Sequence, residues 1–319
     1  MLRTSALPSP MVALCLLTLA IPANGQSAPA APAWVIGKMV VQVDNARRSS
    51  LINPLSPPDP NTTVIVLDPT NDIVVSDLAG SRPRKIAEGL DPAFSPNGQF
   101  IAFCGYTNAA RNDLQIMAIN PDGSGRVQLT DIKGLPRNPT WSPDGSKIAF
   151  NATSNKGPVV MVFDLVNAKI VGIARGAFPR WSPDGKRLVL IQTPGADAGP
   201  YSISIANADG TDVKNVVDTR APVPAAIWGP DGASIIYTSD EHHRSAIFRV
   251  KLDGSDPEEI AGDKNLEMYF PSISPDGKQL VVIEGELGSQ TLVLIDLGTG
   301  KSRTLSSAAY GSVLWVRNH

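Results

Sequence analysis

One pattern of polar and apolar positions recurs five times along the chain. Each copy reads Pro-x-Trp-Ser-Pro-Asp-Gly or a close variant, and two further residues lead into an apolar triplet of β-favouring residues. The triplets are Ile101–Phe103, Ile148–Phe150, Leu188–Leu190, Ile235–Tyr237 and Leu280–Val282. Spacings of 47, 40, 47 and 45 residues separate the Asn or Asp positions, which are Asn97, Asp144, Asp184, Asp231 and Asp276. A period near 45 with short strands is typical of β-propeller blades.

The repeated Ser-Pro-Asp-Gly segment has the residues of a tight turn between two strands. Proline sets φ at the second turn position, the aspartate caps a backbone N–H, and glycine takes the left-handed conformation. Five acidic or amide residues in equivalent places also suggest a metal or catalytic array. Because turn chemistry accounts for all five, we interpret them as one structural turn per blade.

Two more strands are predicted in each unit. The third is an apolar segment such as 113–119 or 245–250, and the fourth follows an Asp-Gly-Ser or Asp-Gly-Thr turn such as Asp122–Ser124. Four strands per repeat correspond to one four-stranded antiparallel blade.

The two ends of the repeat region predict a sixth blade. The fifth unit needs residues to about 305 for its last strand, which leaves Ser312–Val316 as a single apolar strand. Near the N-terminus, Gly37–Val41 resembles a second strand, and Asp72–Leu78 and Arg84–Ala87 resemble third and fourth strands. One C-terminal strand plus three N-terminal strands would close the ring and remove its open edges.

We therefore expect an all-β, six-bladed β-propeller over residues 35–319. The long segment 44–71 is expected to be an insertion in the composite blade. Such a propeller is expected to be a monomer.

The N-terminal segment predicts export. Arg3 precedes an eleven-residue apolar run, Met11–Ile21, and small residues at Ala23 and Gly25 suit cleavage before Gln26. A helical span of the membrane needs about twenty apolar residues, so this run is too short for one. Residues 1–25 are thus expected to be a signal peptide and 26–34 a Pro/Ala tether, with the mature protein periplasmic or secreted.

Composition agrees with a turn-rich β-protein and limits its partners. The chain has 27 Gly and 28 Pro among 319 residues, and both disfavour long helices. Its net charge of −2 gives no electrostatic reason to expect nucleic acid or an anionic membrane as partner. Without the signal peptide, Cys104 is the only cysteine, so no internal disulfide is expected.

The Pro-x-Trp-Ser-Pro-Asp-Gly copies and the later Asp-Gly-Ser turns resemble the repeats of the TolB-type six-bladed β-propeller family. The resemblance covers roughly residues 35–319 and concerns only the propeller half of TolB, which carries an α/β domain before it. It implies the fold and leaves the function open. Prolyl-oligopeptidase-like enzymes carry similar propellers, but this sequence has no Gly-x-Ser-x-Gly nucleophile motif.

The expected topology separates two faces of the ring. Loops that join strands two and three, or one blade to the next, emerge on one face, which we call the loop face. The Ser-Pro-Asp-Gly turns emerge on the opposite face, the turn face. Because function on rigid scaffolds concentrates in variable loops, the loop face is expected to bind the partner. The candidate partner-binding residues are Arg47, Arg48, Arg111, Asp240, Glu241, His242, His243 and Arg244.

We expect no catalytic residue, cofactor or metal. His242 and His243 lie beside two acids, but contiguous residues on one loop lack the converging geometry of a metal site. The favoured function is an exported, non-catalytic binding or scaffold protein with a protein partner at the cell envelope. The alternative is an enzyme or carbohydrate-binding protein with its site at the mouth of the central channel.

Overall fold

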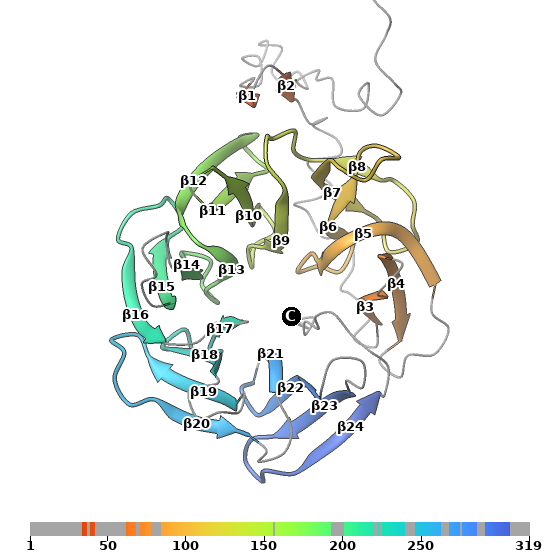
Figure 1. Ribbon diagram of the computed structural model, residues 1–319. Helices are drawn as coiled ribbons and strands as arrows, with labels where there is room; N and C mark the ends of the chain where they lie inside the picture. The colour runs from red at the N-terminus through yellow and green to blue at the C-terminus, as the bar shows by residue number, and fades with distance from the viewer. Residues whose placement is uncertain are drawn as a thin grey trace, which may run out of the picture.

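The computed structural model describes the strands of 34–36, 39–41 and 62–67 and most of the chain from 71 to 306. In that part it leaves out residues 78–83, 156, 193–200, 220–222, 224, 240–245, 263–267, 275 and 286–290. Every regular element in the described residues is a β-strand, and the sheets are arranged around a ring (Figure 1). Within those residues, no helix has the length and apolar character that a membrane crossing requires.

Four sheets each contain four antiparallel strands in sequence order. The first of them comprises β9 (Pro136–Trp141), β10 (Lys147–Ser154), β11 (Gly157–Asp164) and β12 (Lys169–Arg175). The second comprises β13 (Ala177–Trp181), β14 (Arg187–Gln192), β15 (Tyr201–Asn207) and β16 (Lys214–Thr219). The third comprises β17 (Ala226–Trp228), β18 (Ser234–Ser239), β19 (Ala246–Lys251) and β20 (Glu258–Ala261). The fourth comprises β21 (Met268–Ile273), β22 (Gln279–Glu284), β23 (Thr291–Asp296) and β24 (Ser302–Ser306).

A fifth sheet has six strands. They are β3 (Thr62–Leu67), β4 (Asp72–Asp77), β5 (Arg84–Phe94), β6 (Ile101–Tyr106), β7 (Leu114–Ile119) and β8 (Val127–Gln128). The first part of β5 pairs with β4 and the second part with β6, so this strand ends one group of strands and begins the next. The prediction of a propeller with four-stranded antiparallel blades is confirmed. The described residues form five large sheets, so the sixth blade stays a prediction.

The N-terminal strands differ in part from the prediction. Met39–Val41 forms β2, which pairs with β1 (Trp34–Ile36) in a separate two-stranded sheet. The neighbour of β4 is instead β3, from the segment expected to be an insertion. The prediction for Gly37–Val41 is therefore wrong, because a short connection at Asn71 (φ 57°) joins β3 to β4 as a local hairpin. The expected strands near Asp72–Leu78 and Arg84–Ala87 correspond to β4 and the first part of β5.

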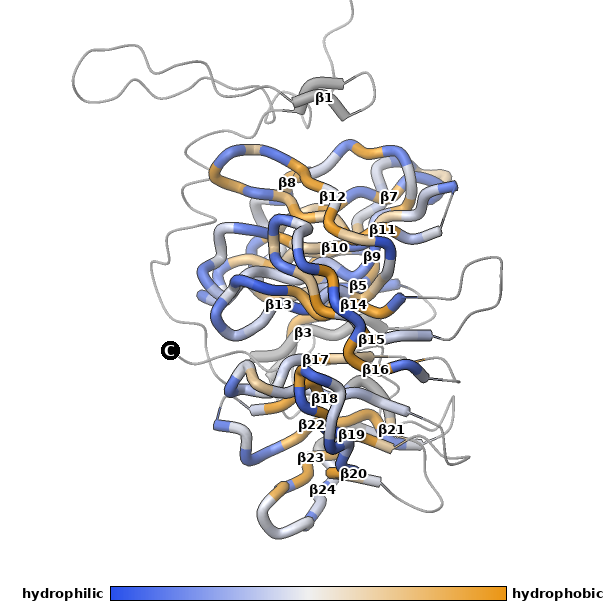
Figure 2. Tube along the Cα trace, turned by 90° about the vertical axis from the view of Figure 1, so that its left-hand side faces the viewer, coloured by the Kyte–Doolittle hydropathy of each residue, from blue (hydrophilic) through white to orange (hydrophobic). Residues whose placement is uncertain are grey.

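Apolar residues fill the spaces between neighbouring sheets. One cluster combines Ala102 and Ile116 of the fifth sheet with Phe150 and Phe163 of the first, all at most 1% exposed. In Figure 2 the hydrophobic segments follow the strands and the hydrophilic segments gather at the connecting turns. The strands β6 and β7 are almost wholly buried, and their alternate residues belong to two different apolar clusters, so both of their faces pack against neighbouring side chains.

The five repeated turns have the geometry predicted for them. At all five, the Asp or Asn Oδ1 accepts the backbone N–H two residues later, at 2.9–3.1 Å. In four copies the preceding serine hydroxyl donates to the same oxygen at 2.6 Å. The glycines have φ between 65° and 72°, the region that favours glycine.

The glycine of these turns also has a tertiary role. A Cβ at Gly277 would lie 2.9 Å from Cγ of Pro230, and one at Gly185 would lie 3.4 Å from Cδ of Pro143. The proline of one turn thus packs on the glycine of the next around the turn face. The fourth copy has Gly229 in place of serine, and a Cβ there would lie 2.2 Å from the Ser234 hydroxyl.

Replacing Asp184 with alanine should lower the free energy of unfolding by about 1 kcal/mol at pH 7, because the N–H of Lys186 and the hydroxyl of Ser182 lose their shared acceptor. The hydrogen bond from Ser182 holds the pKa of Asp184 below its ordinary value of 3.8. The carboxylate therefore stabilises the fold above pH 3.8, and this contribution is lost as the pH falls through the lower pKa of the folded state.

Urea denaturation at pH 7 and at successively lower pH measures this difference. The gap between wild type and variant should narrow below pH 3.8. Glu258→Ala, on the exposed strand β20, is the matched control and should have little effect at either pH. A gap that is constant with pH would contradict the role assigned to the carboxylate.

Candidate functional site

Three of the innermost strands share an irregularity. In β5, β9 and β13 a residue with positive φ precedes a proline: Asp91 (52°), Asn138 (56°) and Phe178 (54°). The pairing register shifts at each of these points. Such β-bulges redirect side chains and are common near functional sites.

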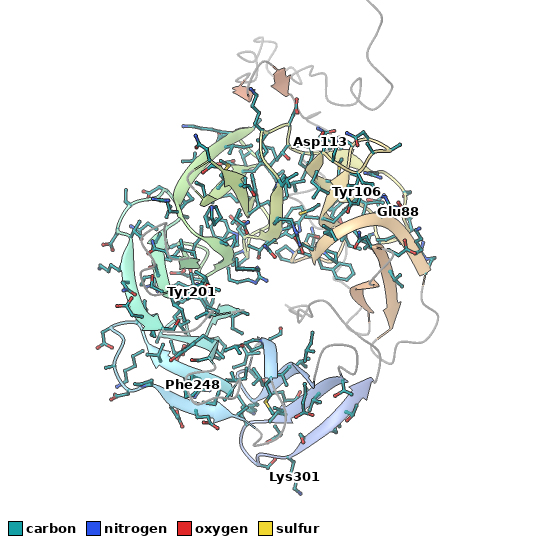
Figure 3. The ribbon with its side chains drawn as sticks, in the orientation of Figure 1. Glu88, Tyr106, Asp113, Tyr201, Phe248 and Lys301 are labelled. Atoms are coloured by element: carbon teal, nitrogen blue, oxygen red, sulfur yellow. The ribbon has the colours of Figure 1, made fainter. Side chains whose placement is uncertain are left out.

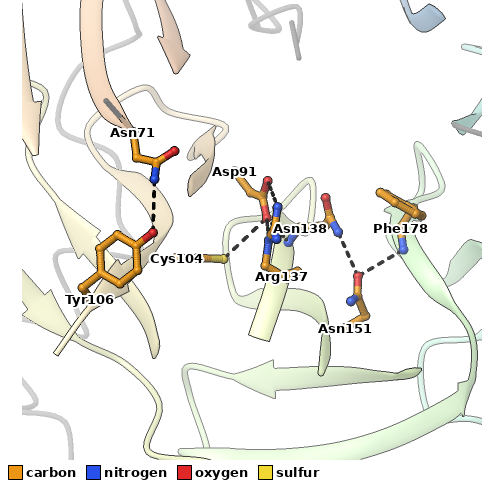
Figure 4. Close-up of polar contacts among 8 residues, drawn as sticks. All are labelled: Asn71, Asp91, Cys104, Tyr106, Arg137, Asn138, Asn151 and Phe178. Atoms are coloured by element: carbon orange, nitrogen blue, oxygen red, sulfur yellow. Dashed lines mark hydrogen bonds and ion pairs between the residues drawn. The ribbon is translucent and has the colours of Figure 1, made fainter. Parts of the chain in front are cut away.

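Asp91 is the hub of a polar group that joins two sheets. Its Oδ2 accepts Arg137 Nε at 2.6 Å and the backbone N–H of Asn138 at 3.0 Å, and its Oδ1 accepts Arg137 Nη2 at 3.2 Å. The Cys104 thiol also donates to Oδ2, at 3.8 Å (Figure 4). We call Asp91, Cys104, Arg137 and Asn138 the Asp91 cluster.

Asn151 repeats this arrangement one sheet further around the ring. Its Oδ1 accepts Asn138 Nδ2 at 3.1 Å and the backbone N–H of Phe178 at 3.2 Å (Figure 4). In both cases a side-chain oxygen of one sheet accepts the N–H of the positive-φ residue of the next. The innermost strand is an edge strand with unpaired backbone groups, and these side chains satisfy part of that edge.

The repeated tryptophans satisfy carbonyl groups on the same edge. The indole N–H groups of Trp141, Trp181 and Trp228 donate to the carbonyls of Ala93, Thr140 and Arg180, each at 3.1 Å. Each of these bonds joins an inner strand to the one before it. The tryptophan of the motif is thus a connection between sheets.

Burial and charge determine the chemistry of the Asp91 cluster. Burial, and then the negative charge of Asp91, raise the pKa of the Cys104 thiol well above its usual value. The thiol is therefore protonated near neutral pH and is a poor nucleophile. The hydrogen bond to Asp91 raises the pKa of Arg137. Because Asp91 already accepts hydrogen bonds from several donors, the cluster is suited to holding the inner strands in place. The alternative function, an enzyme with its site at the mouth of the channel, stays a prediction.

Arg111 is the one predicted partner-binding residue that falls in the described part of the chain. Its Nη2 lies 2.7 Å from Glu88 Oε2, and its guanidinium lies 5.5 Å from the centre of the Tyr106 ring. Figure 3 shows Glu88 and Tyr106 close together on the fifth sheet. Because 48% of the Arg111 side chain is exposed, it remains available on the loop face.

The other predicted residues cannot be placed with Arg111. Arg47, Arg48, Asp240, Glu241, His242, His243 and Arg244 lie outside the described residues. Across the described part of the chain, no group of three or more His, Cys, Asp or Glu has the arrangement of a metal site.

Sequence reasoning missed Asp91, Asn138 and Asn151. A signal was present, because Asp91 and Asn138 each precede the first proline of a repeat copy. That position differs between copies, whereas the turn that follows it changes by at most one residue from copy to copy.

Comparison with known proteins identifies relatives of this chain. The family described as the TolB beta propeller domain matches residues 106–313. The Tol-Pal system protein TolB of Thioalkalivibrio sulfidiphilus is 30% identical over 179 residues, which is 54% of this chain and 38% of that protein. The protein of the same name from Coxiella burnetii is 31% identical over 144 residues, or 44% of this chain and 31% of that protein. The chain thus spans about a third of the length of these relatives.

A solved structure shares the fold. The crystal structure of TolB from Acinetobacter baumannii aligns with a TM-score of 0.63 at 19% identity, and it covers 80% of this chain and 66% of that one. At this identity the likeness concerns the fold alone.

Proposed function

This chain belongs to the TolB β-propeller family, and from that premise we propose that it is an exported, non-catalytic binding protein whose loop face recruits a protein partner at the cell envelope. The relatives named as components of the Tol-Pal system support an envelope setting. The mature protein would be periplasmic or secreted and monomeric.

The difference between the two faces carries this proposal. On the turn face, the repeated carboxylates accept hydrogen bonds from their own turns, as Asp144, Asp184 and Asp276 do. The loop face carries side chains that differ from blade to blade, including the half-exposed Arg111. Repeated turn residues are explained by the fold, so specific recognition is better supplied by the loops.

We also propose that the ring has six blades. The strands β3, β4 and the first part of β5 supply three strands of the composite blade. The inner edge of β3 has no strand partner in the described part of the chain. Ser312–Val316 has the apolar sequence of a strand and would pair with that edge.

Site-specific photo-crosslinking in intact cells tests the partner surface. A photoreactive residue in place of Asp240 should capture a protein partner, whereas one in place of Lys186 on the turn face should capture none. With the captured partner identified by mass spectrometry and purified, replacing Asp240, Glu241, His242 and His243 with serine should weaken its binding at least tenfold, on the order of the loss of one charge-assisted contact.

The melting temperature should change little in this fourfold variant, because we expect these residues to lie on the surface, where substitutions contribute little to stability. Asp184→Ala should spare affinity while it lowers stability. Crosslinking from Lys186, or loss of binding in folded Asp184→Ala, would show that the turn face is the working surface.

A further inference from the structure

Arg180 is a cation on an inner strand. It lies on β13, the strand at the central end of the second sheet (Figure 1). The equivalent residues of the neighbouring sheets are Thr140 on β9 and Ile227 on β17, neither of which is charged. Its backbone carbonyl accepts the indole of Trp228 at 3.1 Å, which fixes the strand at this point.

The guanidinium of Arg180 has few protein partners. Its Nη1 donates to the Pro179 carbonyl at 2.9 Å. None of the ion pairs among the described residues includes Arg180. A guanidinium has five N–H donors in a planar fork, so most of the donors of Arg180 have no partner among the residues that the structure describes.

Arg180 and Asp91 both lie on strands that border the central channel of the ring. Arg180 is on β13 and Asp91 is on β5, with the sheet β9–β12 between them around the ring. The side chain of Arg180 is half-buried there, and its surroundings lower its pKa by desolvation, with Asp91 opposing that effect.

Asp91 does not neutralise this cation. The carboxylate of Asp91 already accepts two hydrogen bonds from Arg137 and one from Asn138. A partly desolvated cation without an anionic partner is costly, and an anion that enters its space removes that cost.

We propose that Arg180 is an anion-binding residue of the central channel and that its ligand is a carboxylate. The planar guanidinium matches a carboxylate through two parallel hydrogen bonds. The negative charge of Asp91 in the same channel disfavours a dianion such as phosphate relative to a singly charged group. The carboxylate comes either from a small organic acid or from an acidic residue of a protein partner. This site goes beyond the proposed loop-face function and does not depend on it.

Nuclear magnetic resonance of the full chain tests the proposal. The signals to follow are the Arg180 Nε–H and the Trp228 indole N–H, which reports on the Arg180 carbonyl. Sodium propionate, a singly charged carboxylate, is the probe, propionamide its uncharged counterpart and sodium phosphate the competing anion, all at constant ionic strength. We expect saturable shifts of both signals with propionate, none with propionamide, and weaker binding of phosphate.

Variants of Arg180 distinguish the effect of its charge on binding from an effect on folding. Arg180→Gln should weaken propionate binding about tenfold to a hundredfold, the range expected for a charge-assisted hydrogen bond. Arg180→Lys should keep part of the affinity, and Arg303→Gln, on exposed β24, should keep all of it. The melting temperature of each unliganded variant confirms that it is folded.

Two capped tripeptides distinguish the sources of the carboxylate. If acetyl-Gly-Glu-Gly-amide shifts the same signals and acetyl-Gly-Gln-Gly-amide does not, the carboxylate comes from an acidic residue of a protein. Propionate binding without peptide binding assigns it to a small acid. Any of three results would overturn the proposal. They are the absence of a saturable shift with every carboxylate, unchanged affinity in folded Arg180→Gln, and binding of phosphate that is tighter than binding of the carboxylate.

Discussion

Deletion of Ser312–His319 is expected to lower the free energy of unfolding by about 4–6 kcal/mol, the value for removing two or three buried apolar side chains at roughly 2 kcal/mol each. In a complete sheet the second strand has neighbours on both sides, as β10 has with β9 and β11. The strand β3 occupies the same place but ends its sheet among the described residues. The proposed C-terminal strand would cover this edge, and its removal would expose it.

The melting temperature of the truncated protein should fall by roughly 10 °C, since each kcal/mol shifts the transition of a domain of this size by about 2–4 °C. Deletion of only Arg317–His319, which lie beyond the proposed strand, is the matched control and should leave the transition almost unchanged. Equal melting temperatures for the two truncations would rule out ring closure by this segment.

Replacement of Asp91 with alanine should lower the free energy of unfolding by about 2–3 kcal/mol, because a partly buried carboxylate accepts charge-assisted hydrogen bonds from the next sheet. Without it, the Asn138 N–H and the Arg137 guanidinium lose their acceptor. The side chains of Asp91 and Arg137 are 21% and 43% exposed, so solvent reduces the loss below that of a fully buried pair.

A second variant of Asp91 and a control at Glu88 show how much the hydrogen bonds of Asp91 contribute to stability. Asp91→Asn keeps an acceptor oxygen and tolerates the positive φ, so it should cost only about 1 kcal/mol. Glu88→Ala removes an exposed carboxylate that also pairs with an arginine, and a surface pair of this kind contributes about 0–1 kcal/mol. Urea denaturation at pH 7 measures all three. Equal losses for Asp91→Ala and Glu88→Ala would show that the Asp91 cluster does not join the sheets.

The repeated turns could be predicted in detail because their interactions are local. The Ser142 hydroxyl, the Asp144 carboxylate and the N–H of Ser146 lie within five residues of one another. The φ of Gly145, 70°, follows from the same short segment. A residue pattern therefore determines the turn before any sheet is assembled.

The pairing of the N-terminal strands could not be predicted in this way. Met39–Val41 and Thr62–Leu67 are both short runs that favour β-structure. Their sequences alone do not show which of them pairs with Asp72–Asp77, since pairing depends on chain connection and on the neighbouring sheet. Only the tertiary structure placed Thr62–Leu67 beside that strand.

The sequence by itself determined the period, the turn at each repeat, the β class and the separation of a loop face from a turn face. The tertiary structure decided which side chains meet at the channel. Asp91 and Arg137 are 46 residues apart, and Trp228 meets the carbonyl of Arg180 from 48 residues away. The physical reason is that turns form from bonds within a few residues, whereas the channel exists only once successive sheets have packed around it.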